Sequence, residues 1–221
     1  MNSKMNKETI KYIIENKTEI NSKDNSGNTA LHLFLRNREK KTKKHEIQFL
    51  LDLKSDLNIK NKFSSTPLLT YMNNKEKIEL EIVKFLVEKK SDLNITNKIK
   101  NSALILSCQN QDENKNEIIQ YLIENKSDLN VENQLGLTAL HYKMIDTDVT
   151  LPLLQKLLGD EIDLERERNG FSPFEHICKH ENFFPTIKFL IENKLSVNCI
   201  NYQKETPLHH SLSLDGQKIF I

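Results

Sequence analysis

The chain has 221 residues, of which 37% are hydrophobic and 29% charged, with a formal net charge of +1. This size and composition predict a folded core, and the balanced charge gives no general attraction to nucleic acid or an anionic membrane. No run approaches the roughly 20 apolar residues that span a bilayer, and three cysteines without C-x-x-C spacing argue against a disulfide framework. We therefore expect a cytoplasmic protein without a membrane partner, and a nuclear location stays open.

Two short phrases alternate along the chain. The first is TALH or a variant of it, and successive copies start 37, 36, 36, 34 and 34 residues apart, at Thr29, Thr66, Ser102, Thr138, Ser172 and Thr206. The second phrase is SDLN, which stands shortly before the next copy of the first, at Ser55, Ser91 and Ser127. A period between 20 and 50 residues is typical of stacked repeat proteins.

In chain order, the two phrases predict a partial repeat, five full repeats and a second partial repeat. The boundaries that follow are 1–24, 25–60, 61–96, 97–132, 133–166, 167–200 and 201–221. Within a repeat, Thr or Ser followed by Pro, as at Thr66-Pro67, predicts a helix start, because the hydroxyl caps backbone N–H groups and Pro fits the first turn. Apolar residues at i, i+3 and i+4, as at Ile47, Leu50 and Leu51, then predict a second helix.

A short extended segment follows each second helix, and SDLN marks its beginning. It is too brief for another helix but long enough for a turn or hairpin. We expect Leu57 and Ile59 to turn inward at the base of this finger. The polar side chains beside them are expected to bind backbone groups where the helix ends, namely Ser55, Asp56 and Asn58.

These phrases resemble the signature of the ankyrin repeat family, which opens near Gly-x-Thr-Pro-Leu-His and closes with a Gly-Ala-Asp-Val-Asn-like segment. The first half is carried by NSGNTALH from Asn25, NQLGLTALH from Asn133 and KETPLHHS from Lys204, and the second by ENKSDLN from Glu124. The resemblance covers nearly the whole chain. It implies an all-α fold in one domain, 1–221: a solenoid of stacked helix pairs with projecting β-hairpin or turn fingers.

The sequence departs from the family pattern in two places. The glycine that ends the second helix in a left-handed conformation is replaced by lysine in five repeats, at Lys17, Lys54, Lys90, Lys126 and Lys194. A residue with a Cβ costs about 1 kcal/mol there. The first three full repeats also have about three or four extra residues between their helices, close to one turn of helix, and we expect longer helices there.

The resemblance implies a non-enzymatic module that binds a protein or peptide on its concave face, through finger tips and first helices. The matching tip positions are Lys62, Phe63, Lys98, Ile99, Gln134 and Leu135. Further apolar residues at or near equivalent positions of the repeats are Leu137, Phe171 and Tyr202. An exposed apolar stripe often marks an interaction site. The alternative is that each tip side chain packs against the neighbouring finger and stiffens the row.

Two other functions stay open. The basic segment RNREKKTKK, from Arg36 to Lys44, raises the possibility of a nucleic-acid or nucleotide sensor, but it lacks the interleaved aromatic residues of single-strand binders. We therefore do not expect a nucleic-acid partner. The array is alternatively a structural spacer or targeting arm of a larger protein.

No catalytic, cofactor or metal site is expected. The histidines of EHICKHE, His176 and His180, would share one helix face, but Cys178 would point elsewhere and no second ligand pair has suitable spacing for zinc. The chain has none of the common hydrolase, P-loop or metalloprotease motifs. The incomplete repeats at both ends, with KIFI as the last residues, lead us to expect either a longer natural chain or self-association through these ends.

Overall fold

The computed structural model describes residues 19–37, 44–73, 78–144 and 151–158, together with positions 188, 191, 192, 206 and 209. Its backbone divides into two compact units, Met1–Ser127 and Asp128–Ile221. Phe171, Tyr202 and the histidines and cysteine of EHICKHE lie outside the described residues, as does most of the two last predicted repeats.

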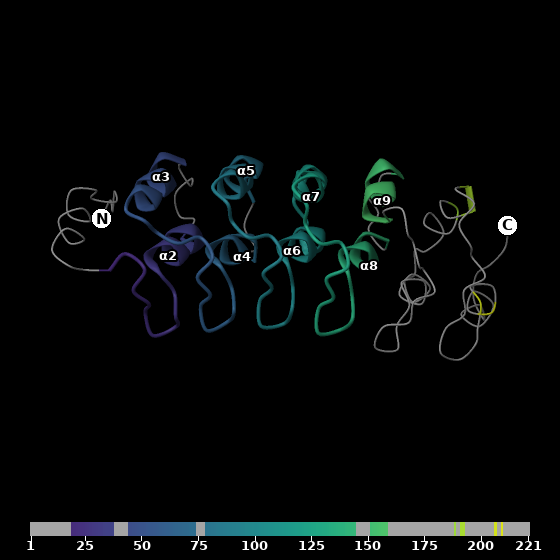
Figure 1. Ribbon diagram of the computed structural model, residues 1–221. Helices are drawn as coiled ribbons and strands as arrows, with labels where there is room; N and C mark the ends of the chain where they lie inside the picture. Colours follow the sequence, from purple (N-terminus) through teal and green to yellow (C-terminus); the bar gives the residue numbers. More distant parts are fainter. Residues whose placement is uncertain are drawn as a thin grey trace. The chain divides into compact units, whose positions relative to one another are not determined.

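The first unit is built from helix pairs joined by extended fingers, with no strand among its described residues. Its helices are α2 (Ala30–Arg36), α3 (Lys44–Asp52), α4 (Pro67–Met72), α5 (Leu80–Glu88), α6 (Ala103–Gln109) and α7 (Lys115–Glu124). The first helices of the pairs form one row and the second helices another (Figure 1). In these rows α4 packs against both α2 and α6, and α5 packs against α7. The predicted all-α stack of helix pairs is confirmed.

The second unit repeats the same pair, with α8 (Ala139–Met144) packed against α9 (Leu151–Leu158). Both of its helices contribute buried apolar side chains, among them Ala139, Met144, Leu154 and Leu157.

The helix starts follow the sequence signals. Thr66 accepts a hydrogen bond on its hydroxyl from the backbone N–H of Leu69 at 3.3 Å, and Pro67 occupies the first turn of α4. Ser102 caps α6 in the same way, through the N–H of Ile105 at 3.3 Å. Each cap satisfies one of the backbone donors that a helix leaves unpaired at its N-terminus.

Three second helices end on a lysine with left-handed backbone, as the sequence predicts. Lys54, Lys90 and Lys126 have φ values of 69°, 74° and 65°. In the first case the N–H of Lys54 donates to the carbonyl of Leu51 at 2.8 Å, and the N–H of the next residue, Ser55, donates to Leu50 at 3.1 Å. This is the double hydrogen bond of a Schellman motif. The geometry that glycine normally supplies is therefore kept at the cost of backbone strain.

The expectation of longer helices in the first three full repeats is wrong where the connection is fully described. α6 ends at Gln109, and residues 110–114 contain no helix. Asn110 turns the chain, because its side-chain carbonyl accepts the N–H of Asp112 at 2.7 Å. The added residues instead reach the preceding repeat: the carboxylate of Asp112 accepts the N–H of Ile78 at 2.7 Å, and Asn114 donates its side-chain amide to the Ile78 carbonyl at 2.9 Å.

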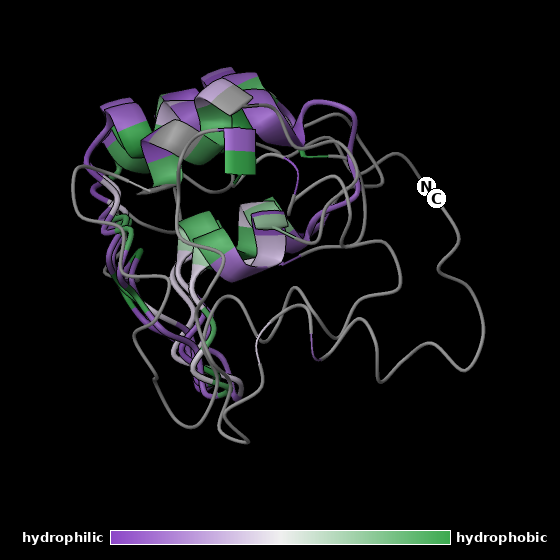
Figure 2. Ribbon diagram, turned by 90° about the vertical axis from the view of Figure 1, so that its right-hand side faces the viewer, coloured by the Kyte–Doolittle hydropathy of each residue, from purple (hydrophilic) through white to green (hydrophobic). Residues whose placement is uncertain are grey.

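The core of the first unit lies between its two helix rows. Fully covered side chains come from every pair, among them Leu31, Leu35, Ile47, Leu68, Tyr71, Ile82, Leu86, Leu104 and Leu122. Hydrophobic residues occur on helices of both rows, whereas the fingers are largely hydrophilic with short hydrophobic stretches (Figure 2). The core of this unit is therefore drawn mainly from the helices, and the fingers add Leu57 and Leu93 to it.

Candidate partner-binding surface

The fingers of the described chain follow one plan at their base. They are the segments before each first helix: the first finger (19–29), the second (53–66), the third (89–102) and the fourth (125–138). Asn21 accepts the N–H of Asp56 at 2.9 Å and donates to the Lys54 carbonyl at 3.1 Å. Asn58 makes the same two contacts one repeat later, with Asp92 at 2.8 Å and Lys90 at 3.4 Å. Asn21 and Asn58, at equivalent positions of successive repeats, therefore each bind one repeat to the next within the first unit.

The other residues of SDLN also serve the scaffold. Leu57 is buried, as expected, and Ile59 is half-buried. Asp56 accepts the N–H of Asn58 at 2.8 Å. The expectation for Ser55 is wrong, because its buried hydroxyl has no hydrogen-bond partner among the described residues, and the same holds for Ser91 and Ser127. This phrase is a structural joint.

The tip of each finger is a tight turn held by an Asp or Asn side chain. In the second finger, the N–H of Ser64 donates to the carbonyl of Asn61 at 2.9 Å, and the N–H of Asn61 donates to Ser65 at 3.0 Å. The side-chain oxygen of Asn61 accepts the N–H groups of Phe63 and Ser65 at 2.9 and 3.0 Å. The same role falls to the equivalent residues of the other fingers, Asp24, Asn97 and Asn133.

The fourth residue of each turn takes a left-handed backbone. It is Gly27, Ser64, Lys100 or Gly136, with φ between 55° and 77°. Gly27 is required for a second reason, because a Cβ there would come within 2.9 Å of the backbone nitrogen of Lys62. The two residues between the Asp or Asn and this position have no positive φ, so no left-handed backbone restricts their identity. These are Lys62 and Phe63 in the second finger.

Backbone hydrogen bonds also join neighbouring tips within the first unit. The N–H of Lys62 donates to the carbonyl of Ser26 at 2.9 Å, and the N–H of Lys98 donates to that of Phe63 at 2.8 Å. The apolar side chains at these tips stay in solvent: Phe63 is 62% exposed and Ile99 is 51% exposed. At the tip of the fourth finger, in the second unit, Leu135 is 65% exposed. The adjacent Lys62, Lys98 and Gln134 are exposed as well.

Leu137 does not belong with these residues. It is only 7% exposed, because it stands directly before the cap residue Thr138, where the chain turns back under the tip. Its N–H donates to the side chain of Asn133 at 3.1 Å, and its carbonyl accepts the N–H of Asn133 at 3.1 Å. The equivalent residues of the other fingers are buried too, namely Asn28, Ser65 and Asn101.

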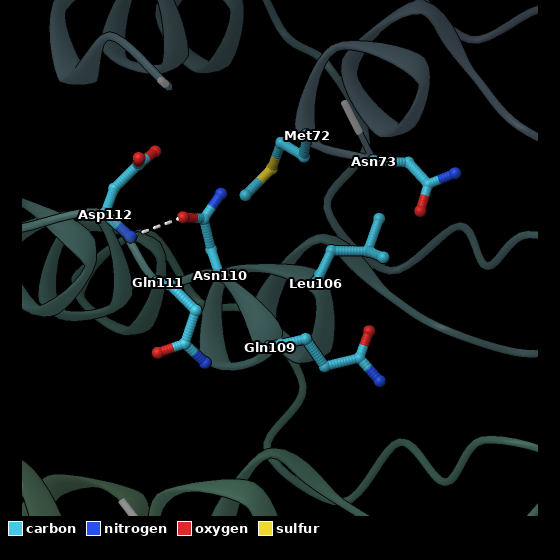
Figure 3. A pocket seen from close by; sticks show the side chains of 7 residues that line it. All are labelled: Met72, Asn73, Leu106, Gln109, Asn110, Gln111 and Asp112. Carbon is cyan, nitrogen blue, oxygen red and sulfur yellow. Dashed lines mark hydrogen bonds between the residues drawn. The ribbon is translucent and has the colours of Figure 1, made fainter. Parts of the chain in front are cut away.

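Sequence reasoning missed a hollow of about 310 Å³ beside the ends of α4 and α6. Its lining, drawn in Figure 3, joins two apolar side chains to amides and one carboxylate: Met72, Asn73, Leu106, Gln109, Asn110, Gln111 and Asp112. Gln109 accepts the side-chain amide of Asn101 at 3.1 Å, which ties this hollow to the third finger. The signal in the sequence was an amide residue directly after or at the end of the first helix, 36 residues apart, at Asn73 and Gln109.

An apolar side chain on α2 also faces solvent, since Leu33 is 37% exposed. The basic segment that follows α2 is described only at its two ends, by Arg36 and Asn37 and by Lys44. The ammonium of Lys44 lies 2.7 Å from the carboxylate of Glu81 on α5. The hydrogen bond and charge of Lys44 lower the pKa of Glu81 below its usual value. This lysine is therefore paired with a neighbouring repeat.

His32 is buried and joins two repeats. Its Nδ1 lies 3.2 Å from the N–H of Thr29, from which it accepts, and its Nε2 lies 2.9 Å from the carbonyl of Ser65. An Nδ1 acceptor and an Nε2–H donor define the neutral ring. Burial lowers the pKa of His32, and the hydrogen bond to Ser65 opposes this effect. The histidine is a structural bridge.

In the part of the chain that the structure describes, no three His, Cys, Asp or Glu side chains gather as a metal site would require. Over the same residues, no helix has the length and apolar character needed to cross a membrane.

Comparison with known proteins agrees with this architecture. A search of curated proteins found no match to the chain. The family described as ankyrin repeats (3 copies) matches residues 1–95 and 70–145, which together exceed half of the 221 residues. Its domains usually act as non-catalytic binding modules for other proteins. With its helix pairs, turn-tipped fingers and repeated Thr-x-Leu-His starts, the chain belongs to the ankyrin repeat family.

Proposed function

We propose that the chain is a non-catalytic cytoplasmic adaptor that captures a protein or peptide across its finger tips and first helices. The observation that carries this proposal is the pair of exposed apolar side chains on adjacent tips, Phe63 at 62% and Ile99 at 51%. An aromatic and an aliphatic side chain that lie mostly in water gain free energy when a partner covers them.

The alternative, that tip side chains stiffen the row by packing on neighbouring fingers, is less well supported. A side chain that served this purpose would be largely covered, whereas Phe63 and Ile99 keep more than half of their surface exposed. The row already has another source of stiffness, the backbone hydrogen bond from Lys98 to Phe63 at 2.8 Å. This bond does not depend on either side chain.

The test replaces Phe63, Ile99 and Leu135 together by Ser. We expect unchanged folding, because each side chain is at least 51% exposed and exposed substitutions usually change stability by no more than about 0.5 kcal/mol. We expect loss of the proteins that wild-type chain retains from an extract of its native cell. The control is Ile191→Ser, which removes a helical apolar side chain that is 56% exposed. Loss of cooperative unfolding in the triple variant would contradict the proposal. So would a triple variant that still retains the same proteins from the extract.

A further inference from the structure

The far halves of the second and third fingers carry an unusual combination of residues. Segments 60–65 and 96–101 together contain four lysines and no carboxylate. All four lysines are exposed, as are Phe63 and Ile99. We call this set the tip edge: Lys60, Lys62, Phe63, Lys98, Ile99 and Lys100.

The first finger carries one cation and one acid near its own tip, Lys23 and Asp24. Lys23 adds a cation to the tip edge, since its ammonium donates to the Lys60 carbonyl at 3.0 Å. The carboxylate of Asp24 is occupied inside its own turn, where it accepts the N–H groups of Ser26 and Asn28 at 2.8 Å each. These hydrogen bonds, with that of the Asn28 backbone first, lower the pKa of Asp24.

The remaining acids of these fingers lie at the base, beside the helices. Asp56 and Asp92 stand in the SDLN joints, and each accepts the N–H of the asparagine two residues later, at 2.8 and 2.9 Å. Positive charge is therefore concentrated at the tips of the first unit, although the whole chain has a net charge of only +1. The fourth finger lacks this feature, since residues 131–137 contain Glu132 and no lysine.

We propose that the tip edge binds an acidic peptide segment that carries apolar anchor residues. This inference rests on the proposed function and names the class of partner. Carboxylates of the segment meet Lys60, Lys62, Lys98 and Lys100, while its apolar side chains cover Phe63 and Ile99. Charge complementarity of this kind raises the association rate and selects among partners, and burial of the apolar pair supplies affinity.

Other anionic partners fit the tip edge less well. Binders of single-stranded nucleic acid stack successive bases on aromatic rings, and Phe63 is the one aromatic residue in these two segments. Interfacial membrane segments collect apolar residues on one face and lysines on the other. Here lysines and apolar residues alternate one by one, in Lys62-Phe63 and Lys98-Ile99-Lys100.

The first experiment selects binders from a random peptide library displayed on phage against the full chain. The same library is then screened against a Phe63→Ser, Ile99→Ser double variant, to find the peptides that need the tips. We expect these tip-dependent peptides to be rich in Asp and Glu beside Leu, Ile or Phe. Tip-dependent peptides without acidic enrichment would overturn this inference and leave the proposed function standing. If no selected peptide depends on the tips, the result contradicts both this inference and the proposed function.

The second experiment measures the affinity of one selected peptide by fluorescence anisotropy. The test variant replaces Lys60, Lys62, Lys98 and Lys100 by Gln. The control variant makes the same charge change with four exposed lysines at the ends of second helices, Lys54, Lys89, Lys90 and Lys126. We expect the test variant to bind on the order of tenfold more weakly at low salt, with a smaller loss at high salt because ions screen exposed charges. Equal losses in both variants would show a general charge effect and overturn the inference.

Single-stranded DNA and phosphatidylserine vesicles serve as competing probes in the same assay. We expect both to bind more weakly than the selected peptide and without sensitivity to the Phe63→Ser, Ile99→Ser change. Tighter binding of either probe, lost in the lysine test variant and kept in the control, would assign the tip edge to that partner and overturn the proposal.

Discussion

Three buried serine hydroxyls of the first unit offer the sharpest test of the scaffold. Ser55, Ser91 and Ser127 follow the left-handed lysines, are 9%, 7% and 6% exposed, and have no partner for Oγ among the described residues. Their replacement by Ala removes three desolvated hydroxyls and vacates only the volume of one oxygen atom at each site. The backbone hydrogen bonds of the serines, such as Ser55 N–H to the Leu50 carbonyl at 3.1 Å, are unaffected. We therefore expect the triple variant to be more stable than the wild-type chain.

The size of the effect follows from the cost of an unpaired buried group. An unsatisfied hydroxyl costs about 1–3 kcal/mol, and we take the lower value because each serine retains slight contact with solvent. Three sites then contribute about 3 kcal/mol if they act independently. For a domain of this size, about 1 kcal/mol corresponds to 2–4 °C in Tm, so the expected rise is about 6–12 °C.

The assay is urea and thermal unfolding followed by far-ultraviolet circular dichroism. Ser107→Ala is the control, because Ser107 is also buried but its hydroxyl donates to the Leu104 carbonyl at 2.7 Å. Loss of this bond should lower the free energy of unfolding by about 1 kcal/mol. A triple variant no more stable than wild type would refute the reasoning and show that the three hydroxyls have partners, such as bound water.

Three further substitutions test the other joints, each by the same unfolding assay. Glycine in place of the left-handed Lys54, Lys90 and Lys126 should raise the free energy of unfolding by about 0.5–1 kcal/mol per site, since it removes the Cβ clash. Asn58→Ala should lower it by about 1–2 kcal/mol through the loss of two hydrogen bonds to the next repeat. Because the folded pKa of His32 is lowered below 6.5, the unfolded chain binds the proton more readily, so stability falls as the pH falls through 6.5. His32→Leu should make this fall shallower between pH 7 and 5.

These outcomes would be contradicted by specific results. A lysine-to-glycine variant that unfolds at a lower urea concentration than the wild-type chain would mean that the left-handed backbone carries no strain. An unchanged midpoint in Asn58→Ala would mean that the repeats hold together without the asparagine. An identical pH profile in His32→Leu would place the acid sensitivity on other groups.

Features that depend on one repeat were predictable from the sequence. The hydroxyl caps at Thr66 and Ser102, the left-handed Lys54 and the inward Leu57 all follow from local backbone geometry and hydrophobic periodicity. The sequence also placed Phe63 at a finger tip but left open whether its side chain packs against the neighbouring finger, and the structure has it 62% exposed.

Features that depend on a neighbouring repeat were not predictable. The added residues before α7 lengthen no helix, because Asp112 and Asn114 bind Ile78, at least 34 residues earlier in the chain. A local pattern contains no information about such a partner. Leu137 was wrongly grouped with the tips for a related reason: its exposure is decided by the turn that Asn133 closes above it.

The conserved geometry of the fingers explains why partner selection belongs at the tips. Each turn requires an Asp or Asn to accept two N–H groups and a residue with positive φ three positions later, as Asn61 and Ser64 do in the second finger. The hydrogen bond from the N–H of Lys98 to the carbonyl of Phe63 on the preceding tip joins backbone atoms. The two side chains between these fixed points are therefore not specified by the fold. They are free to change with the partner, and in the second and third fingers they combine lysine with an exposed apolar residue.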